Sequence, residues 1–419
     1  MAWARGVLPH RQDKVMTNPV AQGSVVTVTL RPDVDRDAAQ AWLGRAEQGI
    51  AELRDARSAT GDRVATIATG FGPSFFTVNG TERFFGVVAP AGFAHMPAVP
   101  SAISITADVV FYIMSTAEGV TARFLHLLWD TRPDVVSVTV ERGYHRLDGT
   151  EPFGYRDGVR NLTRTDRGRI VFVDPDRHAD EPAFAVDGTY MAYLRITQNL
   201  DAFRQIPPEA QDRTIGRARD GRRLDLPSGT DPHTEGDITS DQIPVNSHVR
   251  KTGPRGQGND TIAIFRRGLP FCETSPDGTL TAGLQFVSFQ ASLDQFDVVF
   301  NRWMLNQNFP IPNAGPDALT TQNLITIDKH GFFFVPAETD HSIATTLFRT
   351  RGKPTKTRTG RIAVRKHLTD APTGAENLLD LHGFRFQLTG PDGTTVGDSF
   401  STDAAGHALS EEVPAGNTW

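Results

Sequence analysis

Two glycines bracket a single carboxylate near the middle of the chain. In the segment EPFGYRDGVRN at 151–161, Gly154 and Gly158 flank Asp157. Glycine permits a tight bend, so this loop can hold one carboxylate forward, where an Asp could serve as an acid or a base. For an isolated pattern of this kind, a surface turn with a solvated Asp is the commoner interpretation. The motif alone therefore leaves both interpretations open.

A histidine lies close to a cluster of basic residues further along the chain. In HVRKTGPR, His248 is followed by Arg250, Lys251 and Arg255. A neutral imidazole is a common axial ligand of haem iron, and nearby Arg and Lys side chains could pair with the two haem propionates. The alternative is a loop histidine beside solvated basic residues, because one of the 12 histidines falling near such a cluster is unsurprising.

Two consecutive arginines end the next apolar segment. In IAIFRRGLPF at 262–271, strand alternation predicts that one of Arg266 and Arg267 points inward and the other outward. A buried Arg requires an anion, a carboxylate or a catalytic purpose. The alternative is an edge-strand pair of arginines in water.

An apolar strand then leads into an amphipathic helix in GLQFVSFQASLDQFDVVFNRW at 283–303. The aromatic residues of such a segment belong to a core more often than to a cofactor contact. Asp294 and Asp297 fall in the first turns of the predicted helix, where the helix dipole favours carboxylates in any case.

The elements that must position these residues alternate between strands and helices. Hydrophobic patterning predicts two successive strand–helix–strand halves of similar size, which indicates a duplicated α+β architecture with antiparallel sheets. In the first half, one strand begins at Ser24 and two others cover 103–114 and 135–142. Helices are expected over 37–55 and 119–128. In the second half the strands cover 189–197, 261–266 and 283–290, with helices starting at 200 and over about 293–304.

Composition changes toward the C-terminus. The stretch RTRGKPTKTRTGR carries six basic residues and no large apolar side chain, which is typical of a linker or exposed edge. Short alternating segments follow it. We therefore predict an irregular arm at 1–22, a first half at 23–150 and a second half at 151–348. A basic linker at 349–361 and a small all-β module at 362–419 follow.

The overall composition limits the class of protein. The 419 residues carry 43 basic and 49 acidic side chains, a formal net charge of −6, which argues against nucleic acid or an anionic membrane as the main partner. The single Cys272 excludes a disulfide framework, and no apolar run is long enough to span a bilayer. No apolar segment follows the basic N-terminal residues, which predicts a cytoplasmic protein.

Taken together and in this order, the four segments resemble the dye-decolourising peroxidases, over about residues 20–335. The resemblance implies two ferredoxin-like halves of the dimeric α+β barrel group, with haem b held between sheet and helices. It implies an enzyme that reduces hydrogen peroxide and oxidises aromatic, dye-like donors in one-electron steps. Whether the protein forms a homo-oligomer is left open by the sequence.

The resemblance also assigns roles to residues. His248 would be the axial iron ligand, Asp157 would move a proton between the two peroxide oxygens, and Arg266 would stabilise the departing charge. Arg266 follows His248 by 18 positions, a spacing similar to that of the family, and Arg267 would then be the outward neighbour. Further haem contacts would come from Arg250, Arg255, Gly158 and Phe286. The chain departs from the family in Gly268, where some relatives carry Asn, and in TGPR, where Asn-Pro-Arg is common.

The axial histidine should also meet a carboxylate, because a hydrogen bond to its other ring nitrogen raises its basicity as a ligand. We expect this carboxylate to be Asp297, with Asp294 as the alternative.

The tail from Gly360 to Trp419 is similar to the pilin-type or collagen-adhesin B-type sandwich of Gram-positive surface proteins. The similarity rests on Lys366, GFRFQLTG, STDAAGHA and VPAGNTW. In that family a Lys and a last-strand Asn form an isopeptide bond, but here the printed sequence stops where that strand would begin.

Two other functions remain open at this point. One is a haem-handling protein that removes iron without opening the porphyrin ring. The other is a surface scaffold with a vestigial peroxidase half, which would place the protein outside the cell or on its surface.

Overall fold

The computed structural model describes most of the first 348 residues and short stretches of the tail. The described residues are 22–56, 64–117, 119–234, 236, 238–253, 262–275, 277–337, 342–348, 359–360, 363–365, 385–389, 395–402, 407–409 and 413–414. The chain divides into two units, Met1–Arg349 and Thr350–Trp419. No helix among the described residues has both the length and the apolar character needed to cross a membrane. The predicted arm at 1–22 falls outside the described residues except for Gln22.

The first half of the large unit is a four-stranded antiparallel sheet covered by two helices. Its strands run in the order β7-β1-β6-β2, so chain order 4-1-3-2 is the ferredoxin-like arrangement. Asp35 caps the long helix, since its side chain accepts a hydrogen bond from the Ala38 N–H. The elements are β1 (Gln22–Leu30), α2 (Arg36–Asp55), β2 (Ala65–Phe71), β6 (Val109–Ser115), α4 (Val120–Leu127) and β7 (Val135–Tyr144).

The second half repeats this strand order. Strand β8 lies between β12 and β11, and both β9 and β10 pair with β11, so the chain order is again 4-1-3-2. The strands are β8 (Thr189–Gln198), β9 (Phe265–Arg266), β10 (Leu269–Thr274), β11 (Leu280–Gln290) and β12 (Ile325–Val335). The helices are α6 (Leu200–Gln205), α7 (Pro208–Ile215), α8 (His248–Thr252), α9 (Leu293–Asp297), the π-helix η5 (Val298–Met304) and α10 (Ala318–Thr321).

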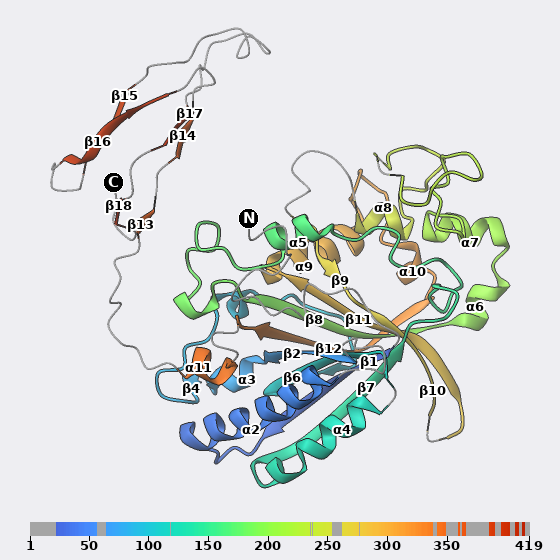
Figure 1. Ribbon diagram of the computed structural model, residues 1–419. Helices are drawn as coiled ribbons and strands as arrows, with labels where there is room; N and C mark the ends of the chain where they lie inside the picture. Colours follow the sequence, from blue (N-terminus) through green and yellow to red (C-terminus); the bar gives the residue numbers. More distant parts are fainter. Residues whose placement is uncertain are drawn as a thin grey trace. The chain divides into compact units, whose positions relative to one another are not determined.

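The two halves share one sheet whose ends also approach each other. Strand β12 pairs with β2 through Phe334 and Phe71. At the other end, a Cβ on Gly143 of β7 would lie 2.6 Å from Cβ of Leu269 in β10, and Gln285 Nε2 donates to the Arg142 carbonyl. The sheet therefore curves into a barrel-like wrap with helices on its outer faces (Figure 1).

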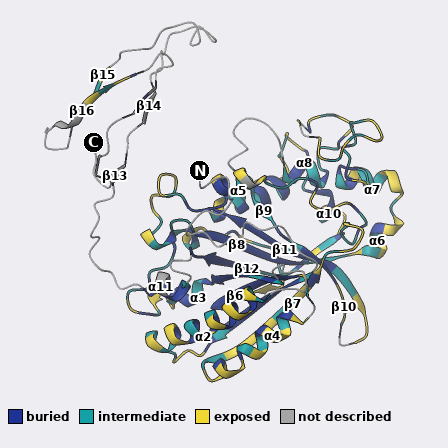
Figure 2. Cartoon of the chain, in the orientation of Figure 1, coloured by how far each residue is buried: buried dark blue, intermediate teal, exposed yellow. Residues whose placement is uncertain are grey.

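Side chains from both halves fill the inside of this wrap. Tyr112, Tyr193, Phe265 and Phe289 belong to one buried cluster there. Two further clusters lie under the outer helices, one beneath α2 and α4 and one beneath α9 and η5. Strands β1, β6 and β8 are accordingly buried on both faces, whereas β7 is largely exposed and the helices expose their outer sides (Figure 2).

Shorter elements connect these parts. They are α3 (Pro73–Phe76), β3 (Thr77–Val78), β4 (Thr81–Glu82), η2 (Ala91–His95), β5 (Ile103–Ser104), η3 (Trp129–Asp134), α5 (Arg164–Ile170), η4 (Ala183–Ala185) and α11 (Ile343–Leu347). The duplicated α+β fold and the helices expected over 37–55 and 119–128 are confirmed. The strand expected over 103–114 is two strands, β5 and β6, and patterning did not predict β2, β10 or β12.

The C-terminal unit contains three antiparallel strand pairs in its described residues. They are β13 (Thr359–Gly360) with β18 (Val413–Pro414), β14 (Ala363–Arg365) with β17 (His407–Leu409), and β15 (Arg385–Thr389) with β16 (Thr395–Ser401). Phe386 stacks on Phe400 across the third pair. Lys366 and the final residues lie outside the described part, so the adhesin-like sandwich stays a prediction.

Candidate functional site

His248 opens helix α8 and is held by a buried carboxylate. Its Nδ1 donates to Oδ2 of Asp317 at 2.7 Å, and the Asp317 side chain has no exposed surface, whereas the imidazole is 33% exposed. Nδ1 is thereby occupied, which leaves Nε2 as the nitrogen that can bind a metal. This pair has the form of a histidine ligand oriented by a carboxylate.

Asp317 is fixed in turn by the short helix that it caps. Its Oδ1 accepts from the Leu319 N–H at 2.8 Å, and its backbone N–H donates to the Met304 carbonyl. The next residue, Ala318, donates to the Asn246 carbonyl, two positions before His248. The carboxylate and the histidine are therefore joined both through side chains and through the backbone.

The expectation that Asp297 or Asp294 supports His248 is wrong. The Asp297 carboxylate accepts from Asn301 Nδ2 at 2.7 Å and from Arg302 Nε at 2.9 Å. Asp294 lies in the first turn of α9, where the Ser292 side chain caps its N–H. These contacts are local to the helix, and Asp317 takes the position that the prediction gave to them.

The basic residues after His248 hold loops together. Lys251 is fully buried, and its Nζ donates to the carbonyls of Asn306, Phe309 and Gly315. Arg250 is 8% exposed, and its Nη1 donates to the carbonyls of Ser240 and Ile243. Nη1 of Arg250 is therefore occupied by loop carbonyls, which gives this arginine a structural role. Arg255 lies outside the described residues.

Arg266 and Phe286 lie on the helix-covered face of the second half. Arg266 pairs with Ser288 in the β9–β11 register, and Phe286 is two residues from Ser288 on the same strand. Side chains two positions apart share a face, so Arg266 and Phe286 face the same side. The Phe286 ring lies 6.4 Å from that of Phe296 in α9, which identifies this side as the one beneath the helices.

The structure brings the Asp157 loop to Arg266. Arg266 Nη2 donates to the Arg160 carbonyl, and Asn161 Nδ2 donates to the Arg266 carbonyl at 2.8 Å. Asp157 is exposed, and its Oδ1 accepts from the Gly158 N–H at 2.6 Å. Gly158 has a φ of +70°, a conformation that glycine adopts without strain. Two of the predicted segments therefore meet at one place.

The base of this loop is firmly held. The buried Glu151 carboxylate accepts from the N–H groups of Phe153 and Tyr155 and from Gln198 Nε2, and burial raises its pKa. The Tyr155 hydroxyl donates to Oδ1 of Asp212 in α7 at 2.6 Å. The loop therefore presents Asp157 from a fixed frame.

Arg267 is not the outward neighbour that strand alternation suggested. It is 1% exposed and lies inside the sheet wrap, with its guanidinium 5.7 Å from the Phe265 ring and 5.9 Å from the Tyr112 ring. Arg267 is therefore buried inside the wrap, whereas Arg266 is half-buried on the side of the helices. Burial lowers the pKa of Arg267.

The sequence did not single out His145, whose imidazole interacts electrostatically with Asp157 and Arg267. Burial lowers the pKa of His145, the Asp157 carboxylate raises it, and Arg267 lowers it further. Its Nε2 is buried and has no hydrogen-bond partner among the described residues. A lone histidine at the end of β7 carries no spacing signal, so sequence patterning had no means to select it.

Comparison with known proteins gives a partial sequence match. Residues 150–340 match the family described as Dyp-type peroxidase, C-terminal. The deferrochelatase of Yersinia pseudotuberculosis is 26% identical over 219 residues, covering 51% of this chain and 50% of the relative. The deferrochelatase of Escherichia coli K12 is 26% identical over 204 residues, covering 45% and 48%. The chain thus matches about half the length of these curated relatives.

Solved structures match over a larger part of the chain. A DyP-type peroxidase from Streptomyces coelicolor superposes with a TM-score of 0.66 and 25% identity, covering 81% of this chain and 96% of that one. Ferric DtpA from Streptomyces lividans gives 0.61 and 25%, covering 79% and 93%. Residues 150–340 therefore match the Dyp-type peroxidase C-terminal family, and the chain shares the fold of solved DyP-type peroxidases.

Proposed function

We propose that this protein is a haem peroxidase that reduces hydrogen peroxide and oxidises aromatic donors. The observation that carries the proposal is the bond between His248 Nδ1 and the buried Asp317, which leaves Nε2 for a metal. This donor set fits haem, because a single imidazole completes the coordination of an iron already held by four porphyrin nitrogens. The family match and the peroxidase fold support the same assignment. We propose haem b as the cofactor.

Haem would supply an iron centre that exchanges electrons with peroxide and with the donor. His248 would bind that iron, and Asp317 would orient the imidazole and raise its basicity. Asp157 would accept a proton from one peroxide oxygen and deliver it to the other. Arg266, tied to the same loop through the Arg160 carbonyl, would stabilise the negative charge on the departing oxygen. Phe286 and Gly158 would border the cofactor.

Three variants test these roles in haem-supplied protein. His248→Ala should lose the Soret band or change it, because the axial ligand is gone. Asp157→Asn and Arg266→Gln should keep the band and lose peroxide-dependent oxidation of an aromatic donor, by about 100-fold or more. Asp176→Asn, an exposed carboxylate, is the control. Unchanged spectra in His248→Ala, or full turnover in Asp157→Asn, would remove the corresponding role.

The names of the curated relatives favour a second candidate, release of iron from haem with the porphyrin left intact. Incubating the haem-loaded protein without peroxide and following porphyrin fluorescence separates the two functions. Metal-free protoporphyrin appearing at a rate that depends on His248 would support iron release. Turnover with peroxide and a donor but no free porphyrin would support the peroxidase.

A further inference from the structure

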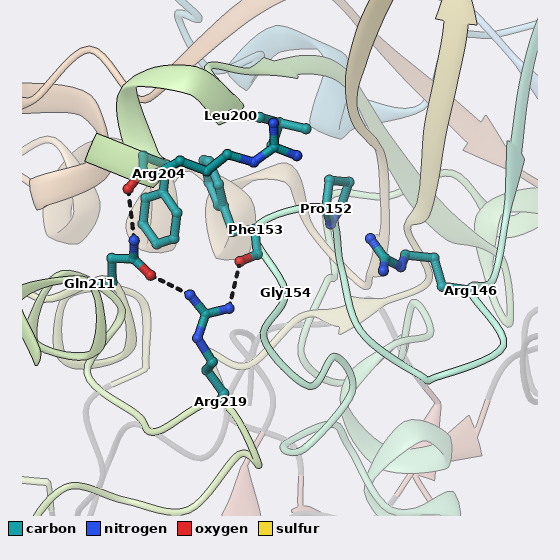
Figure 3. Close-up of a pocket in the computed structure, with 9 residues that line it drawn as sticks. Arg146, Pro152, Phe153, Gly154, Leu200, Arg204, Gln211 and Arg219 are labelled. Atoms are coloured by element: carbon teal, nitrogen blue, oxygen red, sulfur yellow. Dashed lines mark hydrogen bonds between the residues drawn. The ribbon is translucent and has the colours of Figure 1, made fainter. Parts of the chain in front are cut away.

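A cavity beside the Asp157 loop combines an apolar wall with three arginines. It has a volume of about 290 Å³, close to the lower end of the range for small-molecule sites, about 300–1,000 Å³. Its wall includes Phe153 and Phe203, whose ring centroids are 4.2 Å apart. Arg146, Arg204 and Arg219 come from three different segments and surround this wall (Figure 3).

Arg219 is the fixed member of the three. Its guanidinium donates to the Phe153 carbonyl at 3.3 Å and to the Gln211 side-chain oxygen, and it lies 5.1 Å from the Tyr155 ring. These partners are neutral, so the hydrogen bonds hold the guanidinium in place without cancelling its charge. The fit is close, since a Cβ on Gly154 would lie 2.6 Å from Arg219 Nη1.

Arg146 and Arg204 are each held by an exposed ion pair. Arg146 pairs with Asp148 at 2.9 Å, and the two side chains are 38% and 53% exposed. Arg204 lies 3.5 Å from Asp201, with the two side chains 70% and 94% exposed. Exposed pairs of this kind contribute little, so both arginines can turn toward a ligand anion at small cost.

The carboxylates nearest the apolar wall are already engaged elsewhere. Glu151 accepts backbone N–H groups from Phe153 and Tyr155, and Asp212 accepts the Tyr155 hydroxyl. None of these acids, nor Asp148 or Asp201, lines the cavity. The lining therefore carries three guanidinium groups and no carboxylate around the apolar wall.

We propose that this cavity binds a small aromatic carboxylate. The ring of the ligand packs against Pro152 and Leu200, the more exposed apolar residues of the lining, and its carboxylate accepts hydrogen bonds from the guanidinium groups, which match a planar carboxylate in geometry. The ligand touches residues 152–154, three to five positions before Asp157. This site is separate from the histidine, so it adds to the proposed function and does not depend on it.

Calorimetric titration of the full-length, haem-loaded protein with benzoate tests the proposal. Benzyl alcohol serves as the neutral probe of the same shape, and inorganic phosphate as the anion without a ring. Benzoate should bind more tightly than either. The double variant Arg146→Gln/Arg204→Gln should weaken benzoate at least about tenfold, because losing even one of the two charge-assisted contacts costs about that factor. Arg213→Gln, an exposed arginine of α7 outside the cavity, should leave the affinity unchanged.

Three results would overturn the proposal. They are equal affinity for benzyl alcohol and benzoate, an unchanged benzoate affinity in both the double variant and Arg219→Gln, and a benzoate-induced Soret shift that persists in the double variant. The last result would place the ligand at the haem. Because the titration needs no turnover, the cavity proposal can fail while the peroxidase proposal stands, and the reverse also holds.

Discussion

Among single residues, we expect the charge on Asp317 to have the largest effect on how strongly His248 would bind the proposed haem iron. Both oxygens of this buried carboxylate are used, Oδ2 by His248 and Oδ1 by the Leu319 N–H. A buried anion on Nδ1–H makes the imidazole a stronger donor to a bound metal than a neutral acceptor would. The position also fixes the ring orientation, because Asp317 is anchored by the helix that it caps.

Asp317→Asn should keep the shape of this contact and remove its charge. We expect a loss of about 10- to 100-fold in peroxide-dependent activity, together with a higher midpoint potential of the haem iron, because a less basic ligand stabilises the oxidised iron less. Steady-state rates and a redox titration measure the two effects. Asp297→Asn is the matched control and should change neither. If Asp297→Asn changed both quantities and Asp317→Asn changed neither, Asp297 would be the carboxylate that supports His248.

The sequence singled out His248 as a candidate ligand but did not point to Asp317, for a physical reason. His248 stands beside a basic cluster, which is a local signal, whereas Asp317 is 69 positions away and reaches it only through tertiary structure. Asp297 lies in the first turns of the predicted helix, but the residues that follow in the chain supply Asn301 and Arg302 as its partners. An Asp directly before the short helix ALTT was the one available sign of a cap at Asp317.

His145 should make the stability of the fold depend on pH. Burial lowers its pKa from the ordinary value of 6.5, so the unfolded chain binds the proton more readily than the folded one. Stability should therefore decrease as the pH falls below about 6.5. Urea denaturation at pH 7.5 and pH 5 should show a smaller difference in His145→Gln than in the parent. The exposed His126→Gln is the control, and an unchanged difference in His145→Gln would contradict the prediction.

Among the elements, α8 joins the histidine to the segment that carries its carboxylate. Lys251, one turn after His248, donates to three carbonyls of the 306–315 segment, which leads to Asp317. Patterning predicted the strands and helices that flank this region, including β8 and the helix after β11. It did not predict the 306–315 loop that follows this helix, because a polar loop held by a buried lysine has no periodicity to detect.

Lys251→Met should loosen this loop. The substitution removes the donor for three carbonyls, and leaving buried acceptors unsatisfied should lower the free energy of unfolding by on the order of 3 kcal/mol. Urea denaturation of the large unit measures it. Arg123→Gln breaks a surface pair with Glu52, in which both side chains are more than half exposed, and should cost less than about 1 kcal/mol. Equal effects of the two substitutions would show that the Lys251 contacts are not structural.

At the scale of the whole molecule, the repeated strand order explains why strand–helix alternation was enough to predict the fold class. Each half is complete as an arrangement of elements, and β2 and β12 join them. The meeting of β7 with β10 could not be foreseen, because it depends on sheet curvature and on close contacts such as Gly143 against Leu269. That meeting encloses Arg267, which strand alternation would place at a surface, together with Tyr112.

The last described helix of the large unit marks where the chain can be shortened. Helix α11 lies just before the division at Arg349, and Ile343, Leu347 and Phe348 belong to the core cluster beneath α2. Glu47 of α2 also accepts the N–H groups of Ile343 and Ala344. A chain ending at Arg349 should therefore keep its stability, its haem spectrum and its turnover.

A chain ending at Ala337 should not. It lacks Ile343, Leu347 and Phe348, and fully burying an apolar side chain of this size contributes about 1.5–3 kcal/mol, so the loss should be several kcal/mol. Thermal unfolding followed by circular dichroism compares the full chain with the two shortened chains. The pair is decisive because both lack the C-terminal unit. If both were equally unstable, residues 350–419 would be required for the fold, and if both were fully stable, α11 would not be part of the core.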